Sequence, residues 1–140
     1  TGIAFRAVYT TTGTVSTSDY RLKKNVNYDF DALALVDRLK PCSFEWKDSK
    51  SGLQDASDHT STTEYGFLAH ELDEVHPLAV SGKKDGKRPA TETEPEQDLH
   101  QGICQTKLIG ILTKAIKELS AANQALTARV AALEAAAASG

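Results

Sequence analysis

Residues 106–138 read TKLIGILTKAIKELSAANQALTARVAALEAAAA, and apolar side chains recur along this stretch every three and four residues. The repeat begins with Ile109 and Leu112 at positions a and d of a heptad, and no proline or glycine interrupts it after Gly110. The pattern predicts a single helix from Thr106 to Ala138. Such a helix is about 50 Å long at 1.5 Å per residue, too long for a small domain to cover.

The apolar seam predicts that the helix associates with other copies of the chain. The residues that would meet at this contact are Leu112, Ile116, Leu119, Asn123, Leu126, Val130 and Leu133. Ile or Val at a, Leu at d and one Asn at a are typical of two-stranded parallel coiled coils. Two alternatives remain: a helix packed lengthwise on its own domain, or an arm that grips another polypeptide.

The residues before this helix predict a small α+β domain. Asn27 or Asp29 would cap a helix that runs to about Leu39, where Pro41 stops it. Strands are expected at 2–9, 42–47, 65–68 and 78–80. In the second of these, Phe44 and Trp46 are expected to face inward. A short helix is expected at 69–75. Polar loops are expected at 48–63 and 81–98, the second joining a basic and an acidic block in an exposed loop or hairpin.

We therefore divide the chain into three parts. Residues 1–17 are expected to end an upstream body, because a lone strand with a Thr-rich connector cannot form a domain. Residues 18–105 form the globular part, and residues 106–140 form the long helix.

Composition argues against several classes of function. The net charge is -3 and the basic residues are dispersed, which argues against a nucleic-acid partner. No apolar run approaches the roughly 20 residues that span a bilayer, so no membrane partner is expected. Cys42 and Cys104 lack metal-ligand spacing and are expected to be free, buried thiols, and the four histidines are not grouped. We expect no metal and no cofactor.

The tract SDYRLKK at 18–24 carries the candidate chemistry. A serine with a lysine five residues later can act as nucleophile and base, because an amine kept neutral by its surroundings accepts a hydroxyl proton. Combined with the self-association seam, this tract suggests a peptide-bond cleavage that waits for assembly. The plainer interpretation is a polar turn in which Ser18 caps a helix start.

Four motifs in order resemble the peptidase S74 family. They are Ser-Asp-x-Arg-x-Lys at 18–23 with Asn25-Val26, Phe44-x-Trp46, YGFLAHEL at 65–72 with Val75, Pro77 and Val80, and the stretch 108–119 that ends in AIKEL. Members of this family are C-terminal intramolecular chaperones of bacteriophage tailspikes, tail fibres and neck appendages. The resemblance covers residue 18 to about residue 133.

The resemblance implies a self-cleaving serine peptidase with a Ser-Lys dyad, acting as a homotrimer. Its cut would fall between Thr17 and Ser18, with Ser18 as nucleophile and Lys23 as base. The client would be an upstream, β-rich fibre body. The chaperone would act in the host cytoplasm during virion assembly and be released from the mature fibre.

Some roles at this site stay open. Lys24 is an alternative base, because periodicity does not decide which amine faces Ser18. Asp19 and Arg21 could support the turn, and Glu71 is a further supporting carboxylate. The rival function is a trimerisation and attachment cap that stays on its fibre without cleavage.

Overall fold

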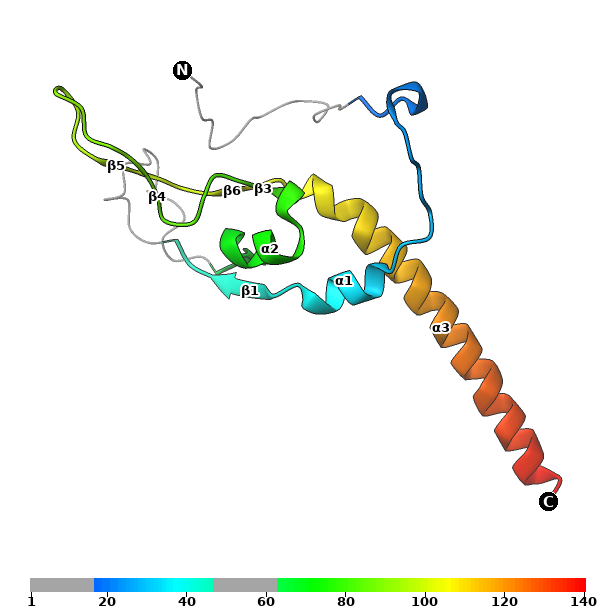
Figure 1. Ribbon diagram of the computed structural model, residues 1–140. Coiled ribbons are helices and arrows are strands. Elements are labelled where there is room, and N and C mark those ends of the chain that lie inside the picture. Colours follow the sequence, from blue (N-terminus) through cyan, green and yellow to red (C-terminus); the bar gives the residue numbers. More distant parts are fainter. Residues whose placement is uncertain (1–16, 47–62) are drawn as a thin grey trace, which may run out of the picture. The chain divides into compact units, whose positions relative to one another are not determined.

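The computed structural model describes residues 17–46 and 63–140 (Figure 1). The expected strand at 2–9 and nearly all of the expected loop at 48–63 lie outside these residues. The chain divides into two compact units, Thr1–Phe30 and Asp31–Gly140. Each unit is treated separately below.

In the described residues of the first unit, 17–30, the chain forms a short 3-10 helix, η1 (Tyr20–Leu22). Asp19 caps it by accepting the Arg21 N–H at 2.9 Å, and the Lys23 N–H closes it on the Tyr20 carbonyl at 3.1 Å. Asn25 then takes a φ of +53°, the left-handed conformation that asparagine tolerates better than most residues. This residue turns the chain just after the SDYRLKK tract. None of the described residues of this unit is buried.

The second unit begins with α1 (Ala32–Arg38), whose N-cap is Asp31. The Asp31 carboxylate accepts the Ala34 N–H at 3.0 Å. The prediction that Asn27 or Asp29 caps this helix was wrong. Asn27 instead accepts the Asp29 N–H at 2.8 Å, a local turn that competes with helix formation and delays the helix start.

Two antiparallel strands follow, β1 (Pro41–Phe44) and β2 (Glu64–Phe67). Phe44 is half-buried, as predicted, and its ring lies over Gly66, where a Cβ would approach it to 3.3 Å. Trp46 was expected to face inward, but it lies beyond the end of β1 and is 44% exposed. Its ring meets the Phe44 ring edge-on at 5.3 Å, so only one of the two aromatics belongs to the strand.

The short helix α2 (Ala69–Val75) has the predicted bounds. The strand expected at 78–80 starts later, because Pro77 opens a 3-10 turn, η3 (Pro77–Ala79), before β3 (Val80–Ser81). The centre of the hydrophobic core is made by Leu72, Ala79 and Leu108, which come from α2, η3 and the C-terminal helix. Partly buried apolar residues surround them: Leu39, Phe67, Val80 and Ile103.

Residues 80–103 form a two-stranded antiparallel arm. The strand β3 pairs with β6 (Gly102–Ile103), and β4 (Gly86–Arg88) pairs with β5 (Gln97–Leu99). The arm carries the basic block on one strand and the acidic block at its tip. This agrees with the predicted exposed hairpin.

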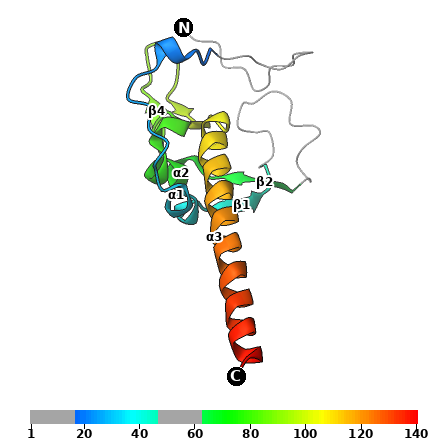
Figure 2. The same ribbon diagram turned by 90° about the vertical axis from the view of Figure 1, so that its right-hand side faces the viewer.

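The long helix α3 (Thr106–Ala138) has the predicted bounds and completes the predicted α+β fold. Its first half packs on α1 through Ala115, which is 4% exposed, and reaches the core through Leu108. In both views the C-terminal half of α3 extends beyond the other elements of this unit (Figures 1 and 2). No helix in the described part of the chain is long and apolar enough to cross a membrane.

The two thiols are free, as predicted, but they are not both buried. Cys42 is half-buried in β1, whereas Cys104 is exposed at the start of α3. The Cys104 Sγ lies 3.2 Å from the Thr106 hydroxyl, and this hydrogen bond is the main cause that lowers the pKa of the thiol.

Candidate functional site

Ser18 and Lys23 are in direct contact in the first unit. The Lys23 Nζ donates a hydrogen bond to the Ser18 Oγ over 2.5 Å. The turn η1 makes this contact possible, because it reverses the backbone between the two residues. Both side chains are exposed. A nucleophile within hydrogen-bond reach of an amine is the arrangement expected of a serine-lysine pair.

Asp19 and Arg21 form a second pair beside the first. The Arg21 guanidinium donates to both carboxylate oxygens of Asp19, with Nε–Oδ1 2.9 Å and Nη2–Oδ2 2.8 Å. The side-chain bond from Arg21 is the main cause that lowers the pKa of Asp19, and the Arg21 backbone N–H adds to it. Asp19 therefore stays ionised and is occupied as an acceptor. Its geometry fits a role in shaping the turn.

Lys24 differs from Lys23 in its contacts. Lys24 is exposed and makes no hydrogen bond or ion pair with any residue in 17–46 or 63–140. The geometry therefore favours Lys23 as the partner of Ser18, a choice that the sequence left open.

Glu71, the other candidate supporting carboxylate, belongs to the second unit. It lies in the first turn of α2, and its Oε1 is 3.4 Å from the Nζ of Lys40. This ion pair joins α2 to the residue that precedes β1. The Lys40–Glu71 contact therefore indicates a structural role for Glu71 within the second unit.

The predicted self-association seam is an exposed face of α3. Its apolar members are between 40% and 68% exposed, from Leu112 to Ile116, and Asn123 is exposed among them. A different face of the helix carries its buried and half-buried residues Leu108, Ile111, Ala115 and Glu118, and Glu118 contacts the start of α1. The second unit therefore leaves the seam uncovered along the helix.

Glu118 has a role that the sequence analysis missed. Its carboxylate accepts the N–H groups of Ala32, over 3.3 Å, and Leu33, over 2.9 Å, at the first turn of α1. The Leu33 N–H is the main cause that lowers the pKa of Glu118, ahead of the Ala32 N–H and the nearby Lys114. The four unpaired N–H groups at a helix start favour such a carboxylate. The only sequence signal was the AIKEL motif that contains Glu118.

Metal ligation has no support in the described residues. Among them, no three His, Cys, Asp or Glu side chains are grouped so as to hold a metal ion.

Part of the chain matches a known family. Residues 18–81 match the model of the Peptidase_S74 family, which is described as the chaperone of endosialidase. The resemblance to this family is confirmed. The matched segment begins at Ser18 and contains the whole serine-lysine contact together with α1, the β1–β2 pair and α2. No curated protein matches the chain.

Proposed function

We propose that this chain is an intramolecular chaperone that promotes the trimerisation and folding of a phage tail fibre or tailspike and then releases itself by autoproteolysis at Thr17-Ser18. The observation that carries the proposal is the hydrogen bond from Lys23 to Ser18, at the first residue of the peptidase-family match. The fibre body would be the client of the chaperone. Cleavage would separate the two once folding is complete.

The proposed reaction is an N-to-O acyl shift followed by hydrolysis. The Ser18 Oγ attacks the Thr17 carbonyl carbon, and Lys23 accepts the hydroxyl proton. The C–N bond then breaks, and the departing Ser18 amine receives the proton back from Lys23. Water hydrolyses the resulting ester, which leaves a carboxylate on Thr17 and restores the Ser18 hydroxyl. Lys23 performs both proton transfers as general base and general acid.

Assembly would switch this reaction on. In the structure Lys23 donates to Ser18, so the amine must lose a proton before it can act as a base. Burial favours the neutral form of an amine, so covering the pair would favour the base. The single chain leaves Ser18 and Lys23 exposed. We therefore infer that neighbouring copies cover the pair in the trimer.

The exposed seam of α3 supports self-association. One face of α3 carries seven apolar or amide side chains that are all exposed to solvent. A second helix of the same length, packed along this face, would cover them. Identical chains provide that partner, and we propose three of them. Asn123 at an a position would fix the register between the copies.

The test is the mass of the chain with and without the nucleophile. The protein is expressed with residues 1–140, and its intact mass and new N-terminus are followed over time. We expect a product that begins at Ser18. Ser18→Ala should abolish this product, and Ser43→Ala, which changes an exposed serine in β1, should leave it unchanged.

The rival function predicts a different result. A trimerisation cap that stays on its fibre gives an intact chain in all three proteins, with the oligomer still present by light scattering. A cut at Thr17-Ser18 that persists in Ser18→Ala would overturn the assignment of the nucleophile.

A further inference from the structure

The arm formed by residues 80–103 contains an irregularity near its base. Ser81 pairs with Gly102 and Gly86 pairs with Leu99, so four residues on one strand, 82–85, face only His100 and Gln101 on the other. Such a bulge redirects side chains and is common beside binding sites. The family match ends at Ser81, so all but the first two residues of this arm lie outside it, and the proposed function leaves the bulge unexplained.

The backbone of the bulge takes an unusual conformation at two of its residues. Gly82 has a φ of +82° and Asp85 a φ of +55°, both in the left-handed region. The Gly86 N–H donates to the Lys83 carbonyl over 3.1 Å, and a Cβ at Gly86 would approach that carbonyl to 3.0 Å. A Cβ at Gly86 would also approach the Leu99 carbonyl of the opposite strand to 3.2 Å, so the loop lies close to that strand.

A depression of about 500 Å³ lies over this bulge. Its lining comes from the bulge, from the neighbouring parts of β4 and β5, and from α2, which contributes His70. The side chains that carry hydrogen-bond donors are His70, Lys83, Lys84, Lys87, His100 and Gln101. Two carboxylates, Asp85 and Asp98, also line it.

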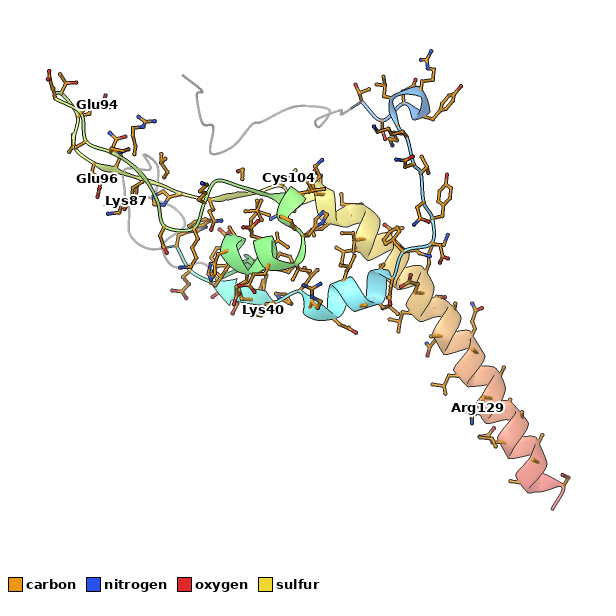
Figure 3. All side chains as sticks on the ribbon, viewed as in Figure 1. Lys40, Lys87, Glu94, Glu96, Cys104 and Arg129 are labelled. Atoms are coloured by element: carbon orange, nitrogen blue, oxygen red, sulfur yellow. The ribbon has the colours of Figure 1, made fainter. Side chains whose placement is uncertain are left out.

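The two lysines nearest to carboxylates are already paired. Lys84 binds Asp85 over 2.7 Å, and Lys87 binds Glu96 over 2.6 Å, the latter pair being marked in Figure 3. The pKa of Asp85 is lowered chiefly by the hydrogen bond and charge of Lys84, and in smaller part by the charge of His70. Lys83 has no ion-pair partner in the described part of the chain.

Gln101 provides an independent observation. Its side-chain nitrogen Nε2 is buried and donates to no residue that the structure describes. A buried donor without an acceptor is costly, because it has lost its hydrogen bonds to water. Gln101 also lines the depression, so a rotation of its side chain would bring Nε2 to an acceptor atom placed there. Two donors of the lining, the Gln101 Nε2 and the Lys83 amine, therefore have no acceptor in the described part of the chain, although the carboxylates of Asp85 and Asp98 also line the depression.

We infer that the depression over the bulge at residues 82–85 binds a small oxyanion, a phosphate or carboxylate group. The oxygen atoms of the ligand would accept from Gln101 and from Lys83, with His70 and His100 as further donors. Binding of this kind needs neither cleavage nor trimer formation. Its test is therefore separate from the test of the proposed function.

The experiment is an NMR titration of the full chain with inorganic phosphate, and in parallel with acetate, at constant ionic strength against chloride. We expect saturable shifts of the Gln101 side-chain amide and of the backbone amides of 82–86. Gln101→Met and Lys83→Met should each weaken binding by about tenfold, the effect of one lost charge-assisted hydrogen bond. The matched controls Gln105→Met and Lys117→Met change exposed residues outside the depression and should bind as the parent does.

Each outcome decides the inference. Unchanged amide signals from Leu72 and Leu108 establish that a variant is folded, and the two variants provide independent tests of the same site. Saturation by phosphate alone or by acetate alone supports the site and identifies which oxyanion it takes. Shifts that do not saturate, or equal affinity in all four variants, would overturn the inference.

Discussion

The segment from Thr17 to Phe30 and the unit from Asp31 to Gly140 use their side chains in opposite ways. The first contains no buried residue, and its specific contacts are polar, such as Lys23 to Ser18 and Arg21 to Asp19. The second holds all the buried apolar residues that the structure describes: Ala32, Leu72, Ala79, Leu108 and Ala115. Substitutions in the first segment should therefore change chemistry with little effect on stability, whereas core substitutions should do the reverse.

The strongest test of this difference is the pair of adjacent lysines. Lys23→Ala removes the amine that contacts Ser18 and should slow self-cleavage by about 10²–10⁴-fold, the usual contribution of a general base. Lys24→Ala removes an equal charge from the next residue and should cut at nearly the parent rate. Cleavage is followed by intact mass. Thermal unfolding should be the same for both variants, and equal loss of cleavage in both would show that position 23 has no special role.

A second test concerns the exposed seam of α3. Replacing Leu119 and Leu126 together by Asp should weaken self-association by about 10²-fold or more, because two large apolar side chains leave the contact and two charges enter it. The control is Ala121→Asp with Ala128→Asp, which adds the same charges on another face of the same helix. Light scattering gives the oligomeric state. Equal loss of the oligomer in both proteins would mean that helix stability, and not the seam, was measured.

A third test concerns the core. Leu72 is 2% exposed, and Leu72→Ala should lower the free energy of unfolding by about 2–5 kcal/mol. Leu78→Ala removes the same atoms from a side chain that is 78% exposed and should change stability much less. Denaturant unfolding measures both. If the Leu72 variant remains folded, its cleavage rate should match the parent, and a large change in that rate would break the separation between the two regions.

The smallest expected effect belongs to Glu118. Its pKa is lowered in the folded chain, first by the Leu33 N–H, so its contribution to stability is full above its ordinary pKa of 4.5 and is lost as the pH falls below it. Glu118→Gln should lower the midpoint of thermal unfolding at pH 7. The difference in midpoint between this variant and the parent should become smaller at acidic pH. Glu134→Gln changes an exposed residue of α3 and serves as control. A pH-independent difference would contradict the capping role.

The sequence predicted the elements whose signals are local. The heptad repeat defined α3 to the residue, and Pro77 defined the end of α2. The start of α1 was missed because Asn27, Asp29 and Asp31 are all good capping residues, and only the local turn at Asn27 decided among them. Trp46 was misplaced because alternation does not show where a strand ends.

The site was predictable in its composition and not in its geometry. The spacing of Ser18 and Lys23 indicated the pair, but the sequence did not exclude Lys24 as the base, whereas in the structure the Lys23 amine contacts the hydroxyl. Glu118 could not be found from the sequence, since its partners are 85 and 86 residues away. The bulge at 82–85 depends in the same way on which strands pair.

The bond from Glu118 to the start of α1 has a consequence for synthesis on the ribosome. Translation proceeds from the N-terminus, so the first turn of α1 is made long before the carboxylate that completes it. During that interval the helix lacks one of its caps, and contacts between residues so distant in sequence form late in folding. The order of translation therefore delays completion of the structure just after the Ser18–Lys23 segment until Glu118 has been made.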